Sequence, residues 1–512
     1  MECLNEMLAR NVRMLGDRPF IIAESETLTY TQFDNRTARI GAVLASKGVR
    51  QGDCVGLYLP SGLDMALGFW AAQQIGAVPV PMTSMFREGE VRAIVAQSDM
   101  AAMIVDETTA PIVAPVRGEL PTLRALLLAG GGEHAGCERL APLIEKASAD
   151  YPRARCAPGD VAALFFTSGT TGMPKGIAQS QFNQYSTLRD MMCAHRTQFG
   201  REIYMCAVPL FTNFGCTVNL NLCLFAGGTI VLHGRWDTEK VLAAIKEHRA
   251  TYFAGTPTMF VYLVGALDPK RHDLSSLRLC TTGGSPVPQI IMRKFEDASG
   301  ARVIQVYGAT ETLGQNVMEP SVGVRKHGAA GLPVGSSRIA IVNDEGKPVP
   351  QGEVGEVVIS GDCVSLGYWR DPEATAKSFT PAGWLSGDLG YLDEDGYLFI
   401  VDRKKDVIIA GGFNIYPLEV ESVLYKHPDV AVCAVVGAAD ESKGEIPVAV
   451  VVRKKDANLD GPAVIAWCRE NLSAYKAPRR VYFVDELPVQ AGKIRKRDLT
   501  RMINEGRLAP AT

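Results

Sequence analysis

A ten-residue segment rich in glycine and hydroxyl side chains carries the clearest chemical signal in the chain. It runs from Thr167 to Gly176, contains three glycines, four hydroxyls and Lys175, and directly follows the apolar run 161–166. The apolar run predicts a buried strand, and the glycines predict a turn that leaves backbone N–H groups and hydroxyls free to bind an anion. Lys175 adds a positive charge. The segment therefore predicts a phosphate-binding loop, with an ordinary Gly/Ser/Thr hairpin as the alternative.

The spacing of this segment differs from that of the common P-loop. In that motif a lysine follows glycine directly and precedes Ser or Thr. Here Lys175 follows Pro174 and precedes Gly176. A nucleoside triphosphatase of the P-loop class is therefore disfavoured.

Four further segments follow the loop. They are 307–311 (Tyr-Gly-Ala-Thr-Glu), 383–388 (Gly-Trp-Leu-Ser-Gly-Asp), 402–406 (Asp-Arg-Lys-Lys-Asp) and 488–494 (Pro-Val-Gln-Ala-Gly-Lys-Ile). Each is a weak signal alone, and the first directly follows residues 302–306, which we predict to form a strand. Together, in this order and at these distances, they resemble the adenylate-forming superfamily, which includes acyl-CoA synthetases, peptide-synthetase adenylation domains and luciferases. The resemblance extends over nearly the whole chain, from Leu28 to Lys493.

The resemblance implies an acid–thiol ligase. Such an enzyme joins a monocarboxylic acid to ATP as an acyl adenylate, releases pyrophosphate, and then forms an acyl-CoA thioester and AMP. Two anions meet in the first step, so cations and oriented N–H groups must offset their repulsion. By resemblance, ATP and AMP bind at Thr167, Ser168, Gly169, Thr170, Thr171, Lys175, Gly283, Gly284, Ser285, Tyr307, Gly308, Thr310, Asp388 and Arg403.

Individual roles also follow from the resemblance. Glu311 is expected to bind Mg²⁺, a hard cation that takes carboxylate and water oxygens. Thr310 is expected to touch the α-phosphate, and Tyr307 to stack on adenine. Asp388 is expected to accept hydrogen bonds from both ribose hydroxyls. Ser386 stands where the family commonly has Thr, a change that keeps the hydroxyl.

The end of the chain is expected to supply the catalytic lysine. Lys493 lies in a glycine-flanked segment and matches the lysine that spans carboxylate and α-phosphate, although by spacing alone a solvated lysine in a basic run is an equal alternative. Residues 403–406 match the family's hinge, with the pivot at Lys405. The coenzyme A channel is expected at Gly411, Gly412 and Phe413, because glycine lets a thin thiol arm pass beside backbone.

The acyl pocket is less clearly marked. Many fatty and aromatic acyl-CoA synthetases have His after the segment 209–211, but this chain continues with Thr212 and Asn213. The change predicts a roomier or more polar pocket, and a medium-chain, long-chain, branched or aromatic acid fits better than acetate. The pocket residues expected from the resemblance are Phe211, Thr212, Asn213, Ala309, Leu313 and Gly314.

Three other functions remain open at this stage. An acyl adenylate ligase that loads a separate carrier protein would use the same motifs, and so would a luciferase-like oxidative enzyme. A non-catalytic nucleotide-binding module is disfavoured because Lys175, Glu311, Asp388 and Lys493 are all intact. A homodimer is compatible with the sequence.

Positioning these residues requires several sheets. Helix-like and strand-like segments alternate up to about residue 400, which favours βαβ units and largely parallel sheets. Short strands separated by turns follow Ser336, and a compact α/β pattern follows Arg403. We therefore predict an α/β protein. It has a large N-terminal domain of parallel-sheet subdomains plus a β-rich subdomain (1–402), a hinge (403–406), and a small mobile α/β lid domain (407–512).

Composition sets the remaining limits. The chain has 512 residues, 47% hydrophobic and 21% charged, and a formal net charge of −3, which is too little charge to favour nucleic-acid binding. No apolar run reaches the roughly 18 residues of a membrane span. The first residues are mildly acidic and lack a secretory signal, so we predict a cytoplasmic protein. Twelve scattered cysteines and seven dispersed histidines predict neither a disulfide framework nor a zinc site.

Overall fold

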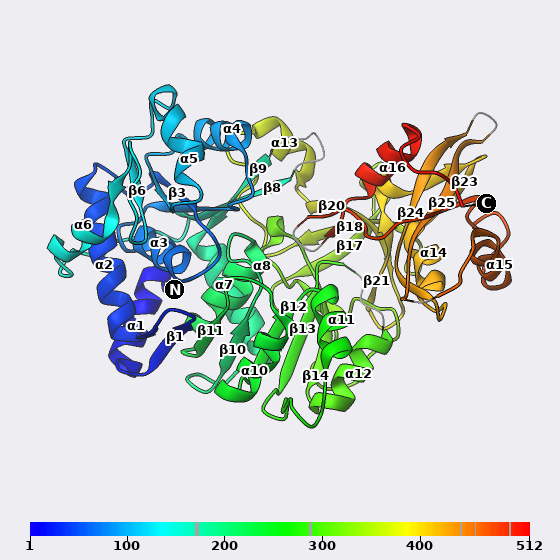
Figure 1. Ribbon diagram of the computed structural model, residues 1–512, viewed down its shortest axis with the longest axis horizontal. Helices are drawn as coiled ribbons and strands as arrows, with labels where there is room; N and C mark the ends of the chain where they lie inside the picture. Colours follow the sequence, from blue (N-terminus) through cyan, green and yellow to red (C-terminus); the bar gives the residue numbers. More distant parts are fainter. Residues whose placement is uncertain (169–173, 286–288, 441–442, 456, 491–492, 512) are drawn as a thin grey trace.

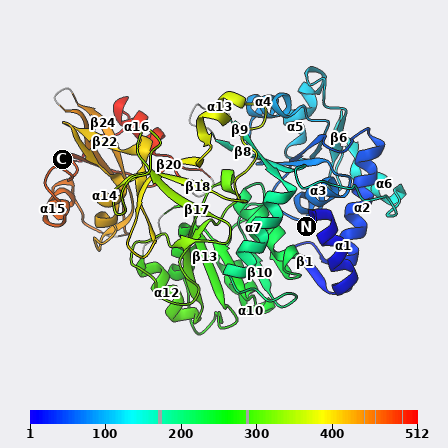
Figure 2. The ribbon, with the colours of Figure 1, turned by 180° about the vertical axis from the view of Figure 1, so that it is seen from behind.

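The computed structural model describes residues 1–168, 174–285, 289–440, 443–455, 457–490 and 493–511. Two large α/β sheets and a β-rich sheet make up most of the molecule, and a smaller α/β part lies at one end, orange to red in Figure 1. Figure 2 shows the same arrangement from behind. The predicted α/β fold class is confirmed, since the parallel sheets were expected from the alternation of helical and strand patterns.

The first sheet has five parallel strands in the order β4-β3-β5-β6-β7. The strands β3 to β6 are buried apolar runs, as expected for parallel strands covered on both faces, whereas the edge strand β7 is short and exposed. The strands are β3 (Cys54–Tyr58), β4 (Val78–Met82), β5 (Ala102–Val105), β6 (Ala125–Leu128) and β7 (Glu138–Arg139). The helices of this region are α1 (Leu4–Leu15), α2 (Tyr30–Ser46), α3 (Leu63–Gln74), α4 (Glu88–Ser98), α5 (Ala110–Val113) and α6 (Leu140–Lys146).

The second sheet has nine strands in the order β16-β15-β14-β13-β12-β10-β11-β1-β2. The six strands from β14 to β1 run parallel, and antiparallel strands close both edges. These strands are β1 (Pro19–Ala23), β2 (Thr27–Thr29), β10 (Ile203–Cys206), β11 (Thr229–Leu232), β12 (Tyr252–Gly255), β13 (Leu279–Gly283), β14 (Arg302–Tyr307), β15 (Val317–Met318) and β16 (Leu332–Pro333). Strand β1 reaches this sheet by pairing with β11, some two hundred residues further along the chain.

Helices cover the second sheet. The helices α10 (Thr238–His248), α11 (Pro257–Ala266) and α12 (Gln289–Ser299) pack their apolar residues on it through one core cluster. The helix α7 (Gln181–Ala194) lies in the larger core shared with the first sheet. Ser180 caps α7 by accepting a hydrogen bond from the Asn183 backbone, and Thr29 caps α2 in the same way through Gln32. Polar residues at these two positions therefore begin the helices.

A short helical stretch follows β10. It consists of α8 (Asn213–Gly215), a π-helix (Cys216–Asn221) and α9 (Leu222–Phe225). Thr212 caps it: its hydroxyl accepts the Gly215 N–H (3.0 Å) and donates to the Pro209 carbonyl (2.7 Å). π-Helical turns are rare and occur often at functional sites.

The β-rich part has five antiparallel strands. They are β17 (Arg338–Val342), β18 (Gly355–Ser360), β19 (Phe379–Thr380), β20 (Gly383–Leu392) and β21 (Leu398–Arg403), with the helix α13 (Pro372–Ser378) before β19. A separate two-stranded hairpin pairs β8 (Val161–Ser168) with β9 (Pro174–Ser180). The predicted strands at 161–166 and 302–306 are confirmed.

The C-terminal part begins after a single 3₁₀ turn at Lys404–Asp406. Its five-stranded sheet has two core clusters of its own. The elements are β22 (Ile408–Ala410), β23 (Phe413–Ile415), α14 (Pro417–Leu424), β24 (Val430–Asp440), β25 (Gly444–Arg453), α15 (Gly461–Asn471), β26 (Arg480–Phe483), β27 (Val489–Gln490), β28 (Lys493–Ile494) and α16 (Lys496–Asn504). Strand β24 is longer than the predicted strand at 430–436, because it continues as a hairpin with β25 to Asp440. Across the described residues, no helix is long and apolar enough to cross a membrane, and the cytoplasmic location stays a prediction.

Candidate active site

Three residues predicted to contact the nucleoside lie together, because two of them bond the carboxylate of the third. Tyr307 ends β14, while Asp388 in β20 and Arg403 in β21 are directly paired across adjacent strands. The Tyr307 hydroxyl donates to Asp388 Oδ2 (2.7 Å), and Arg403 Nε donates to Oδ1 (2.9 Å). Asp388 is 7% exposed. Burial, followed by the negative charge of Asp388, raises the pKa of Tyr307 well above its usual value, so Tyr307 stays a neutral donor.

A hollow of about 350 Å³ lies beside this carboxylate. Its walls are Ser386 and Gly387 from β20, Arg403 at the end of β21, and Lys404 and Lys405 from the turn that follows. The exposed lining is mostly hydrocarbon, but three of the five residues carry a positive charge, which suits a group with an apolar face and phosphate. Lys405, the predicted pivot, is exposed and lies in the 3₁₀ turn between the two parts of the chain.

The predicted phosphate-binding loop joins the two strands of a hairpin. Thr167 pairs with Lys175 and Ser168 with Pro174, so the loop spans 169–173. Gly169, Thr170 and Thr171 lie outside the described residues, as does the side chain of Ser168. The backbone of Lys175 lies in β9, at the end of the hairpin. The hairpin is present, and the phosphate-binding role of the segment and of Lys175 stays a prediction.

Tyr368 connects the hairpin to the predicted metal-binding residue, and the sequence analysis missed it. The Lys175 ammonium lies over its ring, 4.9 Å from the centroid, and its hydroxyl donates to Glu311 Oε1 (3.2 Å). Residues 366–369 run alongside β9, with hydrogen bonds from Leu366 N to Ala178 O (2.8 Å) and from Trp369 N to Gly176 O (2.7 Å). The residues next to Tyr368 in the sequence form no phosphate-binding pattern, so only the fold brings Tyr368 to the site.

The segment 307–314 folds into a tight turn. A Cβ on Gly308 would lie 1.5 Å from the Gly314 carbonyl oxygen, so only glycine fits there. A 3₁₀ turn, Thr310–Thr312, follows, and then Leu313 adopts φ +60° and Gly314 φ +133°. Positive φ at a buried leucine is uncommon and is found most often at functional sites. The turn leaves Glu311 half-buried beside Tyr368.

Glycine is also required at the predicted adenine loop. A Cβ on Gly283 would lie 2.6 Å from the carbonyl oxygen of Val306 in the neighbouring strand, and Gly284 has φ +89°. Ser285 is exposed, and residues 286–288 lie outside the described residues. The two glycines therefore bring the ends of β13 and β14 close together near Tyr307.

The predicted acyl-pocket residues come from two segments. Phe211 lies in the turn after β10 and Asn213 begins α8, whereas Leu313 and Gly314 belong to the turn described above. The two segments approach each other at Gly314. A Cβ placed on Gly314 would lie 3.0 Å from Val218 and 3.6 Å from Asn213 Nδ2. The Thr212 hydroxyl spends its only donor on the Pro209 carbonyl, so of the residues 212 and 213 only Asn213 has a side-chain N–H to offer a ligand. Ala309 is half-buried before the turn.

The predicted C-terminal residues lie on two hairpins. The Lys493 backbone pairs with Gln490, so it begins β28 rather than lying in a loop, and its side chain is outside the described residues. Gly411 (φ +58°) and Gly412 (φ +86°) form the two-residue turn between β22 and β23. Nothing lies within 4 Å of a Cβ on Gly412. The turn explains these glycines without a close approach, and the coenzyme A channel stays a prediction. Phe413 is 60% exposed and packs on Tyr475.

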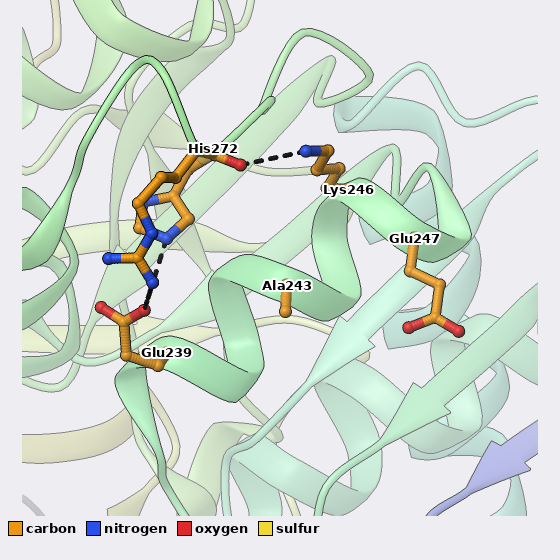
Figure 3. Close-up of a pocket in the computed structure, with 6 residues that line it drawn as sticks. Glu239, Ala243, Lys246, Glu247 and His272 are labelled. Atoms are coloured by element: carbon orange, nitrogen blue, oxygen red, sulfur yellow. Dashed lines mark hydrogen bonds and ion pairs between the residues drawn. The ribbon is translucent and has the colours of Figure 1, made fainter.

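A second hollow, of about 320 Å³, lies away from these residues on α10 (Figure 3). Its charged groups satisfy one another: Arg271 bonds Glu239 (2.9 Å), and Lys246 donates to the Arg271 carbonyl (3.1 Å). The hollow contains none of the predicted site residues, and we assign it no role.

Comparison with known proteins identifies the family. Residues 8–369 match the AMP-binding enzyme family, and residues 419–492 match the AMP-binding enzyme C-terminal domain. The chain belongs to the AMP-binding enzyme family. The predicted membership of the adenylate-forming superfamily is therefore confirmed.

Several relatives of this AMP-binding enzyme are similar along their whole length. A feruloyl-CoA synthase from Amycolatopsis sp is 35% identical over 96% of this chain and 97% of its own. The anthranilate CoA ligase AuaEII in complex with anthranoyl-AMP has a TM-score of 0.91 at 28% identity, covering 99% of this chain and 98% of its own. ATP-bound MatB from Rhodopseudomonas palustris has a TM-score of 0.90 at 28% identity, and its apo structure one of 0.80 at 29%; both cover 98% of this chain and 99% of their own. The predicted enzyme class, an AMP-forming acid–CoA ligase, is confirmed.

Proposed function

We propose that this acid–CoA ligase adenylates a largely apolar monocarboxylic acid with ATP and then transfers the acyl group to coenzyme A. One observation carries the proposal: the turn 307–314 connects two clusters of interacting side chains. Tyr307, Asp388 and Arg403 form the first, and Lys175, Tyr368 and Glu311 form the second. Tyr307 and Glu311 are four residues apart, so one nucleotide of ordinary length can reach from one cluster to the other.

In this proposal the first cluster binds the nucleoside. Asp388 is already held as a charged acceptor by two donors, and it accepts the ribose hydroxyls with its remaining lone pairs. Tyr307 presents its ring to adenine, beside the backbone of Gly283 and Gly284. Because Arg403 already pairs with Asp388, the carboxylate is positioned before ATP arrives, which lowers the entropic cost of binding.

The second cluster binds the phosphates. Lys175 and the hydroxyls and N–H groups of 167–171 offset the charge of the departing pyrophosphate, and Thr310 contacts the α-phosphate. Glu311 fits a Mg²⁺ ligand because it offers a half-buried carboxylate. In the described part of the chain, no group of three His, Cys, Asp or Glu residues gathers as a metal site, so the other ligands would be phosphate and water oxygens. A bound Mg²⁺ would neutralise phosphate charge there.

Catalysis of the first step is assigned to Lys493. Its ammonium would neutralise the acid carboxylate and the α-phosphate as they meet. We divide the chain into an adenylation domain (1–402), a hinge (403–406) and a lid domain (407–512), with rotation at Lys405 exposing the adenylate to the thiol. The separate cores of the C-terminal part and the single turn that joins it support this division.

The experiment that tests this function measures AMP release from ATP and Mg²⁺ with straight-chain, branched, alicyclic and aromatic acids, each with and without coenzyme A. Turnover that depends on both the acid and coenzyme A, with a matching acyl-CoA by mass spectrometry, is the expected result. Adenylate formation unaffected by coenzyme A would instead indicate a carrier protein as the acceptor. The absence of acid-dependent AMP release with every acid would overturn the proposal.

A further inference from the structure

Asn213 begins the helical stretch that faces the turn 307–314, and it is almost completely buried. Its exposed fraction is 5%. Its side-chain oxygen Oδ1 accepts two hydrogen bonds, from Gln179 Nε2 (2.9 Å) and from the Thr217 hydroxyl (2.9 Å). The acceptor half of the amide is therefore satisfied within the protein.

The hydrogen-bond network also fixes which way the Asn213 amide points. Gln179 Nε2 donates to the backbone carbonyl of Thr310 (3.0 Å), and a carbonyl can only accept. Gln179 Oε1 in turn accepts from Gln184 Nε2 (2.7 Å). The atom of Gln179 nearest Asn213 must then be nitrogen, so the atom of Asn213 that it meets must be oxygen. Exchanging the two ends of the Asn213 amide would place two donors against each other.

This orientation leaves the donor half of the amide available. Among the described residues, no hydrogen bond from Asn213 Nδ2 is found, and Nδ2 is not one of the buried polar atoms that lack a partner. The nitrogen therefore keeps open space beside it, although the residue as a whole is buried. It lies near Gly314, where a Cβ would be 3.6 Å away. The neighbouring Leu313 is apolar and offers no acceptor side chain.

We propose that Asn213 Nδ2 selects the acid, by donating a hydrogen bond to a carbonyl or ether oxygen that lies on the acyl group at a distance from the carboxylate. The inference rests on the proposed function, because it takes the space beside Gly314 as the acyl pocket. The fully buried side chains of Leu313 and Val218 make the surroundings of this donor apolar. A single donor in an apolar pocket discriminates strongly, because an acid without the oxygen leaves the amide unpaired.

The test uses matched acids that differ only in one oxygen. A medium-chain acid is compared with oxo acids whose keto group moves along the chain from C4 to C8, and a 4-ethylcinnamic acid with its 4-methoxy counterpart. For the wild-type enzyme, kcat/KM is expected to be at least about 10-fold higher for the acid whose oxygen reaches Nδ2. In Asn213→Leu, which is similar in volume but has no donor, the preference is expected to disappear. Asn219→Ala, a change in the same helical stretch, should leave the ratio unaltered.

A second variant covers the case in which Asn213→Leu does not fold. Asn213→Asp keeps an oxygen for Gln179 and Thr217 but replaces the donor with an acceptor, so the preferred oxo or methoxy acid should become the poorer of each pair. Thermal unfolding and ATP binding establish that each variant is folded. A wild-type enzyme with equal kcat/KM for every pair, or a preference that survives both substitutions, overturns the inference. That result still shows turnover of the plain acids, whereas failure of the proposed function shows no acid-dependent AMP at all.

Discussion

At the scale of single residues, the site depends on side chains that satisfy one another before any substrate binds. Asp388 receives donors from Tyr307 and Arg403, and Glu311 receives one from Tyr368. Asp388 keeps further lone pairs for a ligand. Fixing the carboxylates in this way favours a ligand that offers hydroxyls to one and a cation to the other.

Asp388→Asn is expected to raise the KM for ATP by about 10- to 100-fold, because an amide cannot accept from Tyr307 and Arg403 on both atoms. The measurement is the ATP dependence of AMP release at saturating acid. Asp395→Asn, an exposed change in the turn between β20 and β21, is the control. An unchanged KM would remove Asp388 from the ribose site.

Tyr368→Phe keeps the ring against Lys175 and removes only the hydroxyl that donates to Glu311. We expect the Mg²⁺ concentration that gives half the maximal rate to rise by about 3- to 10-fold, because one hydrogen bond that holds Glu311 is lost. The KM for the acid should be unaffected. Tyr391→Phe, whose ring stacks on Phe399 elsewhere, serves as the control. If the Mg²⁺ dependence is the same in both variants, the hydroxyl has no part in holding Glu311.

At the scale of elements, a buried ion pair fastens the start of α16 to the C-terminal sheet. Lys496 bonds Glu421 of α14 (2.7 Å), and Glu421 also accepts the Val435 N–H of β24 (2.7 Å). Nearby, Asp402 of β21 accepts the Leu418 N–H at the start of α14 (2.8 Å). Burial raises the pKa of both carboxyls, and Lys496 partly offsets the shift. Lys496 lies three residues after Lys493, so the pair also anchors the strand that carries the proposed catalytic lysine.

Lys496→Met should lower the free energy of unfolding by about 3–5 kcal/mol at neutral pH, because it leaves Glu421 buried and unpaired. Without the lysine, the raised pKa of Glu421 rises further. The folded variant then takes up a proton as the pH falls, so its deficit relative to the wild type should shrink between pH 8 and pH 5. Melting temperatures across this range, with Lys377→Met as an exposed control, measure the effect. A deficit that does not change with pH would contradict it.

Sequence reasoning succeeded where a pattern is local. The strands before the phosphate loop and before Tyr307, and the α/β class, follow from runs of apolar residues that the structure confirms. It failed where a residue acts through the fold. Tyr368 reaches Lys175 only because residues 366–369 lie beside β9, and the capping role of Thr212 depends on the Pro209 carbonyl. Such pairings between distant or tightly folded segments leave no periodic signal.

At the scale of the whole molecule, the structure resembles ATP-bound MatB (TM-score 0.90) more than apo MatB (0.80), although the coverage is the same. In the proposed mechanism the two parts change their arrangement between the half reactions, and the hinge at Lys405 turns before the thiol reaches the adenylate.

Lys493→Ala is expected to abolish adenylation, by at least about 100-fold, while largely sparing thioester formation from a supplied acyl adenylate. The two half reactions are measured separately, as acid-dependent pyrophosphate release and as acyl-CoA formation. Lys377→Ala is the matched exposed control. Equal loss of both half reactions would contradict a mechanism in which the two domain arrangements use different residues.

The position of β1 at the far side of the nine-stranded sheet also affects how the chain is made. Strand β1 is synthesised some two hundred residues before its partner β11, which ends at Leu232. Until then the buried strand residues Phe20 and Ile21 have only the neighbouring short strand β2 to pair with. Between the synthesis of β1 and that of β11, the nascent chain therefore holds an apolar segment that has not reached its final partner, while the strands of the whole first sheet are made. Apolar segments exposed in this way are prone to misfolding and to capture by chaperones.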